Sequence, residues 1–157
     1  MGNTFDIIIF EPHYAADFKR LNLEWLKRYF RVEPIDEQVL SRPEDILRDG
    51  GAIWLAKEGS AVVGCCALIA KGDGAYELSK MAVTASAQGK GLGRRLLNAA
   101  VRGFIKTGGR LLFLETNTAL ETAIRLYESS GFEHRQTPEQ SPYERANVYM
   151  VYTGLLL

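Results

Sequence analysis

Three glycines on alternate positions mark the stretch of this sequence best suited to bind a charged group. Gly89, Gly91 and Gly93 lie within residues 88–93, and the residues that follow place apolar side chains at helical spacing. A glycine-rich loop at the start of a helix leaves backbone N–H groups free to point at one place, and the helix dipole adds positive potential there. These residues therefore predict an anion site, for which phosphate is the usual ligand.

Two nucleotide-binding patterns do not fit this loop. The Walker pattern requires Gly-x-x-x-x-Gly-Lys followed by Ser or Thr, and the chain lacks it. The dinucleotide pattern Gly-x-Gly-x-x-Gly requires a glycine at Arg94 if counted from Gly89, or at Leu96 if counted from Gly91. That pattern also belongs on the first strand of a βαβ series, whereas this loop follows four predicted strands. A nucleotide-binding protein, and glycines that only permit a turn, are the weaker alternatives.

The loop is positioned by a predicted strand over residues 75–83 and by a helix that ends at Gly108. Runs rich in β-forming residues predict further strands over residues 5–10, 52–57, 61–70, 110–117, 132–135 and 147–153. Helical spacing predicts a helix after Pro12, a short one within 31–43 and one from Leu120 toward Gly131. This order predicts one domain over residues 1–157 with an α+β fold, a mixed, mostly antiparallel sheet and helices on both faces.

Composition restricts the class of function. The chain carries 19 basic and 19 acidic residues, and this zero net charge argues against a protein that neutralises nucleic-acid phosphates. No apolar run approaches the roughly 20 residues of a membrane span, and no secretory signal is evident at the N-terminus. Cys65 and Cys66 are adjacent in an apolar run, which predicts two buried strand residues and no metal site. We therefore expect a cytoplasmic protein without a nucleic-acid or membrane partner.

Three segments, in the same order, resemble the GNAT superfamily of acyl-CoA-dependent N-acyltransferases. Residues 88–93 match the family's pyrophosphate loop, Gln/Arg-x-x-Gly-x-Gly/Ala. Residues 80–83 resemble the family's fourth strand, and residues 126–132 resemble its fourth helix with the Gly-Phe corner that ends it. The resemblance covers most of the chain and implies the GNAT-like fold, with acetyl-CoA as the acyl donor.

The resemblance also implies how coenzyme A binds. Backbone N–H groups of residues 88–94 would hold the pyrophosphate, with charge added by Lys90, Arg94 and Arg95. The strand that carries Met81 and Val83 would separate from the strand over 110–117, so that pantetheine pairs with its edge like an added strand. The residues implied for the cofactor are Met81, Ala82, Val83, Gln88, Gly89, Lys90, Gly91, Leu92, Gly93, Arg94, Asn117, Ala123 and Tyr127.

Acyl transfer to an amine requires a neutral nucleophile and a stabilised leaving thiolate. Holding a lysine-like amine neutral at pH 7 costs about 4.6 kcal/mol, whereas an α-amino group costs about 1.4 kcal/mol. The need for a base therefore depends on the acceptor. The resemblance implies that Tyr127, on the apolar face of its helix, is the general acid toward the thiol. The alternative is a core aromatic whose hydroxyl is satisfied locally.

Glu77 is the expected base. It shares the parity of Met81 and Val83 in one strand, so alternation predicts that all three side chains face the thioester. It also lies eleven residues before Gln88, as does the base glutamate of the family's protein-lysine acetyltransferases. Glu115 on the neighbouring strand, and a relay through water, are the alternatives.

The acceptor pocket is expected from residues 25–43 and 137–146. These segments offer both signs of charge, so they do not reveal the polarity of the acceptor: Tyr29, Arg31, Glu33, Asp36, Tyr143, Glu144 and Arg145. We expect an N-acetyltransferase that moves an acetyl group to a primary amine of a small metabolite or peptide. A non-catalytic acyl-CoA-binding sensor or partner module is the alternative. The acceptor, the length of the acyl group and the oligomeric state, with a homodimer among the options, stay open.

Overall fold

The computed structural model describes residues 4–137 and 144–154. These residues form a seven-stranded sheet in the order β1-β2-β3-β4-β5-β7-β6. Neighbouring strands are antiparallel except β4 and β5, which are parallel. The expected α+β fold with a mixed, mostly antiparallel sheet is thus confirmed. The strands are β1 (Phe5–Ile9), β2 (Ala52–Glu58), β3 (Ala61–Gly72), β4 (Ala75–Val83), β5 (Leu111–Thr116), β6 (Phe132–Arg135) and β7 (Val148–Tyr152).

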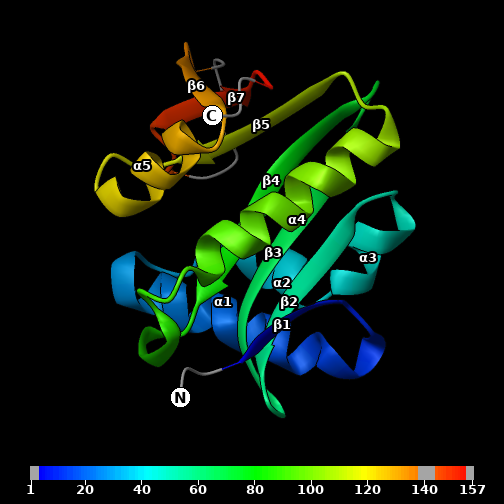
Figure 1. The fold of residues 1–157 in the computed structure, drawn as a ribbon, viewed down its shortest axis with the longest axis vertical. Helices are drawn as coiled ribbons and strands as arrows, with labels where there is room; N and C mark the ends of the chain where they lie inside the picture. Colours follow the sequence, from blue (N-terminus) through cyan, green and yellow to red (C-terminus); the bar gives the residue numbers. More distant parts are fainter. Residues whose placement is uncertain (1–3, 138–143, 155–157) are drawn as a thin grey trace.

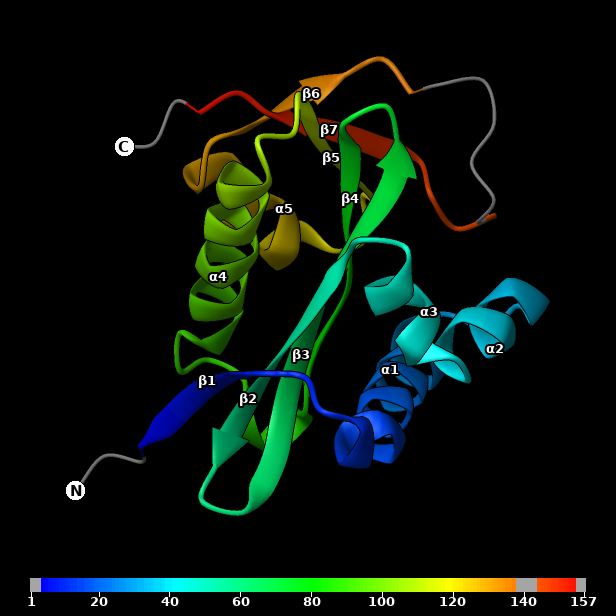
Figure 2. The same cartoon turned by 90° about the vertical axis from the view of Figure 1, so that its right-hand side faces the viewer.

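Helices cover both faces of the sheet (Figures 1 and 2). Helices α4 (Leu92–Thr107) and α5 (Glu121–Ser129) lie on one face, and α1 (Ala15–Tyr29), α2 (Pro34–Leu40) and α3 (Pro43–Arg48) lie on the other. Short 3-10 turns occupy Pro12–Tyr14 and Ala85–Ala87. The sequence predicted one short helix within residues 31–43. This helix forms as α2, which begins at Pro34, and a second short helix that was not predicted, α3, begins at Pro43.

Two apolar cores flank the sheet. The first lies under α4 and α5 and includes Leu96, and the second lies under α1, α2 and α3 and includes Phe18. Cys65 and Cys66 of β3 are fully buried, one in each core, as expected for neighbours in a strand. Within the part of the chain that the structure describes, no helix is long and apolar enough to cross a membrane.

Strands β4 and β5 pair at one end only. Residues 75–77 of β4 pair with residues 111–113 of β5. Beyond this point β4 continues beside β3 to Val83, whereas β5 continues beside β7 to Thr116. Figure 1 shows the two strands diverging along their length. The expected separation of the two strands is therefore confirmed, and it opens the middle of the sheet.

A bulge interrupts β4 at Lys80. Two residues of β4, Lys80 and Met81, lie opposite the single residue Cys66 of β3, and Lys80 has a left-handed backbone with φ of 56°. The extra residue reverses the alternation of the side chains that follow. Met81 and Val83 therefore pack against the core under α4, whereas Glu77 lies on the side of α1, α2 and α3. The expectation that Glu77 shares a face with Met81 and Val83 is wrong.

Candidate active site

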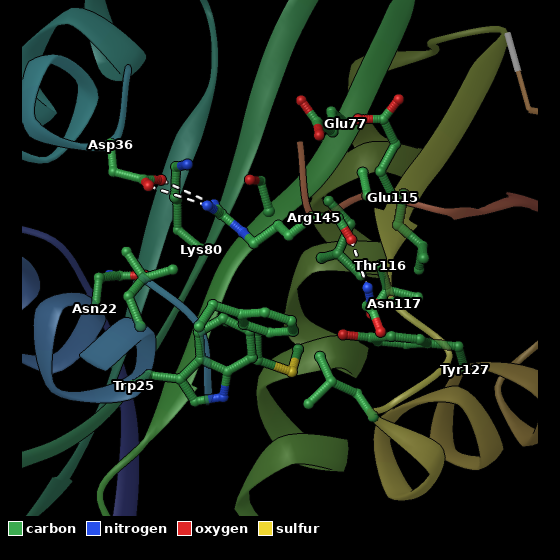
Figure 3. Close-up of a pocket in the computed structure, with 18 of the residues that line it drawn as sticks. Asn22, Trp25, Asp36, Glu77, Lys80, Glu115, Thr116, Asn117, Tyr127 and Arg145 are labelled. Carbon is green, nitrogen blue, oxygen red and sulfur yellow. Dashed lines mark hydrogen bonds and ion pairs between the residues drawn. The ribbon is translucent and has the colours of Figure 1, made fainter. Parts of the chain in front are cut away.

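A pocket opens where β4 and β5 separate, and side chains from both faces of the sheet reach it (Figure 3). Its walls come from α1, α2, β4, β5, α5 and the segment before β7. The expected acid Tyr127, the expected base Glu77 and the alternative base Glu115 line this one pocket. Its polar and charged lining residues are Asn22, Asp36, Glu77, Ser79, Lys80, Glu115, Thr116, Asn117, Tyr127 and Arg145.

Tyr127 reaches the pocket from α5. Its side chain is only 9% exposed, and its ring packs edge-on against Phe132 with the centroids 6.1 Å apart. The hydroxyl end points into the cavity (Figure 3). Burial raises the pKa of Tyr127, and the neighbouring Cys66 thiol adds to the rise. The hydroxyl is therefore protonated at neutral pH and is able to donate a hydrogen bond or a proton.

Glu77 is a buried carboxylate, 7% exposed, on the part of β4 that still pairs with β5. Its Oε1 lies 3.6 Å from Nζ of Lys71. Burial raises the pKa of Glu77 and the charge of Glu115 adds to this rise, while Lys71 and Lys80 oppose it. Because the bulge lies beyond Glu77, this carboxylate reaches the pocket from the face opposite to Met81. Glu77 reaches the site through the opening between the strands. It does not do so by facing the same side of β4 as Met81 and Val83, as the alternation of side chains had predicted.

A buried ion-pair network forms the wall next to α2. Nη2 of Arg145 lies 2.8 Å from Oδ1 of Asp36, and Nη1 lies 3.0 Å from Oδ2 of Asp36 and 2.8 Å from Oε2 of Glu33. Oδ2 of Asp36 also accepts the backbone N–H of Glu33 at 2.8 Å, and Oε1 of Glu33 accepts the backbone N–H of Glu144 at 3.2 Å. Burial acts to raise the pKa of Asp36, but these hydrogen bonds and the charge of Arg145 hold it below its ordinary value.

Lys80 joins this wall from β4, and sequence reasoning missed it as a pocket residue. Burial lowers the pKa of Lys80 to about 8; Arg145 and Lys71 contribute to the fall, while Asp36 and Glu77 oppose it. The left-handed backbone at the bulge directs this side chain to the pocket. Nothing in the sequence signals that conformation, because a lysine seldom adopts it.

Other residues expected at the acceptor pocket have different places. Tyr29 is exposed at the end of α1, with its ring centroid 5.5 Å from that of Trp25. Arg31 and Glu144 form an exposed ion pair. Tyr143 lies outside the described residues. Trp25, the first residue of the expected segment 25–43, lines the cavity.

The glycine loop has the open backbone that an anion site needs. Gly89 and Gly91 have φ of 78° and 82°, and a Cβ added at either would meet no protein atom within 4 Å. Gly91 is the N-cap residue of α4, and no side chain caps this helix. Gly93 differs, because a Cβ there would lie 3.4 Å from Cδ2 of Leu126 in α5. Gly89 and Gly91 thus leave the loop accessible, and Gly93 allows close packing of two helices.

Several side chains of residues expected to bind coenzyme A make contacts within the protein. Nε2 of Gln88 donates to the carbonyl of Val83 at 3.0 Å, which connects the loop to the end of β4. Arg94 donates to Oγ of Ser129 at 2.9 Å and to Oγ of Ser130 at 3.3 Å, so it connects α4 to the end of α5. The ammonium of Lys90 lies 5.7 Å from the centroid of the Phe5 ring, and Arg95 donates to the Phe5 carbonyl at 2.9 Å.

Asn117 directly follows β5, and Ala123 lies in α5. Nδ2 of Asn117 donates to the carbonyl of Arg145 at 2.6 Å, and its Oδ1 accepts the N–H of Ala119 at 2.8 Å. Ala123 packs against the core under α4. Asn117 therefore positions the backbone of Arg145, and its contact with a cofactor stays a prediction, as does that of Ala123.

Known proteins resemble this chain in sequence and in fold. A family model described as the acetyltransferase (GNAT) domain matches residues 49–134. The uncharacterized N-acetyltransferase YjgM of Escherichia coli K12 is 35% identical over 114 residues, which cover 69% of this chain and 65% of that protein. The IAA acetyltransferase of Azospirillum brasilense is 34% identical over 102 residues, which cover 64% of this chain and 63% of that protein. The matches thus span slightly less than two thirds of these relatives.

Solved structures show the same fold. A GNAT-family acetyltransferase from Staphylococcus aureus Mu50 matches with a TM-score of 0.84 at 22% identity, covering 94% of this chain and 98% of that one. YncA from Salmonella typhimurium, solved with its cofactor acetyl-CoA, matches with a TM-score of 0.74 at 21% identity, covering 94% and 92%. The chain belongs to the GNAT acetyltransferase family. The family expected from the sequence is thereby confirmed.

Proposed function

We propose that this protein transfers an acetyl group from acetyl-CoA to a primary amine of a small metabolite or peptide. One observation carries the proposal: the hydroxyl of Tyr127 and the carboxylates of Glu77 and Glu115 line one pocket where β4 and β5 separate. A carboxylate that accepts a proton and a hydroxyl that donates one are the two groups that help an amine to displace a thiolate.

The loop over residues 88–94 is the proposed pyrophosphate site. Gly89 and Gly91 present accessible backbone, and α4 begins directly after Gly91 with uncapped N–H groups that suit an anion. The edge of β4 beyond residue 77, which β5 leaves, offers backbone groups to the amides of pantetheine. On this arrangement Met81, Ala82 and Val83 would lie along the pantetheine arm, and the thioester would point toward Tyr127.

Glu77 is the proposed base. The raised pKa of this buried carboxylate makes it a stronger proton acceptor than an exposed glutamate. It would take a proton from the acceptor amine, directly or through a water molecule, as the amine nitrogen attacks the carbonyl carbon of the thioester. Glu115, on the neighbouring strand β5, is the second candidate for this role.

Tyr127 is the proposed acid. As the tetrahedral intermediate collapses, the C–S bond breaks and the electron pair stays on sulfur. The Tyr127 hydroxyl donates a hydrogen bond to this sulfur and then its proton, and the proton removed from the amine returns to the phenolate through solvent. The products are the N-acetylated amine and free coenzyme A, so protons and electrons balance.

A thiol-release assay with acetyl-CoA tests the proposal against amino acids, polyamines, aminoglycosides and short peptides, with mass spectrometry of the products. We expect N-acetylation of at least one amine, with one coenzyme A released for each product. Tight acetyl-CoA binding without transfer to any amine would contradict the proposal and favour a non-catalytic binding module. The two free, buried cysteines suit a reducing compartment, so we place this activity in the cytoplasm.

A further inference from the structure

Charged groups gather in two parts of the pocket (Figure 3). The carboxylates of Glu77 and Glu115 lie together on one side of the strand opening, and the cations of Lys80 and Arg145 lie on the side of α2, together with the carboxylate of Asp36 that Arg145 binds. We propose that the acceptor is a free α-amino acid with an apolar side chain, its amine toward the two carboxylates and its carboxylate toward the two cations. This inference rests on the proposed acetyl transfer.

The side of the pocket next to α2 is suited to a carboxylate ligand because the carboxylates of Asp36 and Glu33 already accept hydrogen bonds from the protein. Both oxygens of Asp36 accept hydrogen bonds from Arg145, and one also accepts the N–H of Glu33. Both oxygens of Glu33 accept bonds as well, from Arg145 and from the backbone N–H of Glu144. These bonds fix the guanidinium at the pocket wall, where Lys80 places a second cation from β4. Two cations held in place favour binding of an anion by charge-assisted hydrogen bonds.

The acidic side is suited to an α-amine. A carboxylate pair attracts the ammonium form, and Glu77 is the proposed base that removes its proton. The amine of a free α-amino acid titrates below a lysine-like amine, although its own carboxylate offsets part of the fall that is seen at a peptide N-terminus. The α-amine is therefore the easier of the two to deprotonate near neutral pH.

Apolar side chains line much of the rest of the pocket, beside the polar Asn22, Ser79, Thr116 and Asn117. Trp25, Leu26 and Phe30 line the pocket from α1 and the residues after it, and the rings of Trp25 and Phe30 lie with centroids 5.6 Å apart. Leu40 of α2 and Leu120 before α5 also line it. A wall of this kind favours an apolar side chain on the acceptor. A peptide N-terminus fits less well, because an amide would replace the carboxylate next to Lys80 and Arg145.

Matched ligands test the inference. L-Phenylalanine is compared with L-phenylalaninamide and with 2-phenylethylamine, which keep the amine and the ring but lack the carboxylate. Binding is measured by calorimetry with coenzyme A present, and kcat/KM by thiol release with acetyl-CoA. We expect the amino acid to bind and react about tenfold to a hundredfold better than either analogue, the range for a hydrogen bond between charged groups.

Substitution of Lys80 tests whether the preference for a ligand with a carboxylate depends on contact between that carboxylate and Lys80. Lys80→Met should weaken phenylalanine binding by about tenfold or more while leaving 2-phenylethylamine nearly unchanged, and Lys80→Arg should keep the preference because it keeps the charge. Lys19→Met, which removes an exposed lysine of α1 outside the pocket, is the control. A merely structural role of Lys80 would weaken both ligands equally.

The outcomes separate the inference from the proposed function. Transfer to amines without preference for the carboxylate, or a preference unchanged in Lys80→Met, would overturn the inference and leave acetyl transfer standing. Selective binding of phenylalanine without acetylation of any amine would support the inference and contradict the proposed function. Absence of both phenylalanine binding and phenylalanine acetylation would overturn the inference.

Discussion

Asp36 and Arg145, 109 residues apart in the sequence, form a bidentate ion pair on the wall of the pocket. Asp36 is fully buried, and the side chain of Arg145 is 18% exposed. Because Asp36 also accepts the N–H of Glu33, the pair holds the N-terminus of α2 against the segment that precedes β7. The shape of the charged wall therefore depends on a contact between distant parts of the chain.

Removing the guanidinium should destabilise the protein strongly. Arg145→Met leaves the carboxylates of Glu33 and Asp36 buried without their cation, which should lower the free energy of unfolding by about 3–5 kcal/mol. Urea denaturation measures the change. Arg31→Met is the matched control, because the Arg31–Glu144 pair is exposed on both sides and should contribute about 0–1 kcal/mol. Equal losses in the two variants would contradict a structural role for the buried pair.

The charge on Lys80 should make carboxylate binding depend on pH. Burial lowers the pKa of Lys80 to about 8, Arg145 and Lys71 add to the fall, and Asp36 and Glu77 oppose it, so the side chain is charged below this pH and neutral above it. 3-Phenylpropanoate, which has a carboxylate and no amine, isolates this effect as a competitive inhibitor. Its Ki should be constant below pH 8 and should rise by up to about tenfold per pH unit above it.

The variant Lys80→Arg is the control for this titration, because a guanidinium stays charged across the range. Its Ki for 3-phenylpropanoate should be nearly independent of pH from about 6 to 9.5. A wild-type Ki that stays constant above pH 8 would show that Lys80 does not bind the carboxylate.

The glycine loop should be sensitive to a single methyl group. Gly89 and Gly91 have left-handed backbones, so Gly89→Ala or Gly91→Ala should cost about 1–2 kcal/mol of stability and should also weaken coenzyme A binding. Gly108→Ala is a matched control: Gly108, at the C-terminal cap of α4, has φ of 72° and open space around its Cβ position. It should lose similar stability with unchanged coenzyme A affinity. Equal affinity in all variants, measured by calorimetry, would place the pyrophosphate elsewhere.

The elements around the glycine loop could be predicted because they depend on local signals. Helix α4 begins after Gly91 and ends at Gly108, and the strand before the loop ends at Val83, as expected. The divergence of β4 from β5 followed from the family resemblance. The second short helix after α1 was missed, because residues 43–48 offer only Pro43 as a start signal and few apolar positions.

The candidate site was only partly predictable, because the bulge at Lys80 depends on tertiary structure. Alternation placed Glu77 on the same face as Met81, and one extra residue in β4 reversed that relation. The same bulge brings Lys80 to the pocket, which no period in the sequence indicates. The ion pair between Asp36 and Arg145 could not be predicted from the sequence either. The two residues are far apart in the chain, and only the folded sheet brings them together.

The central claim is that acetyl transfer takes place in this pocket with Tyr127 as the acid. The most direct measurement compares kcat of Tyr127→Phe with that of Tyr152→Phe, whose tyrosine also packs against Phe132 but does not line the pocket. With an acceptor amine in hand, we expect kcat to fall by about a hundredfold or more in Tyr127→Phe and to stay near wild type in Tyr152→Phe. Full activity of Tyr127→Phe at every pH would contradict the account.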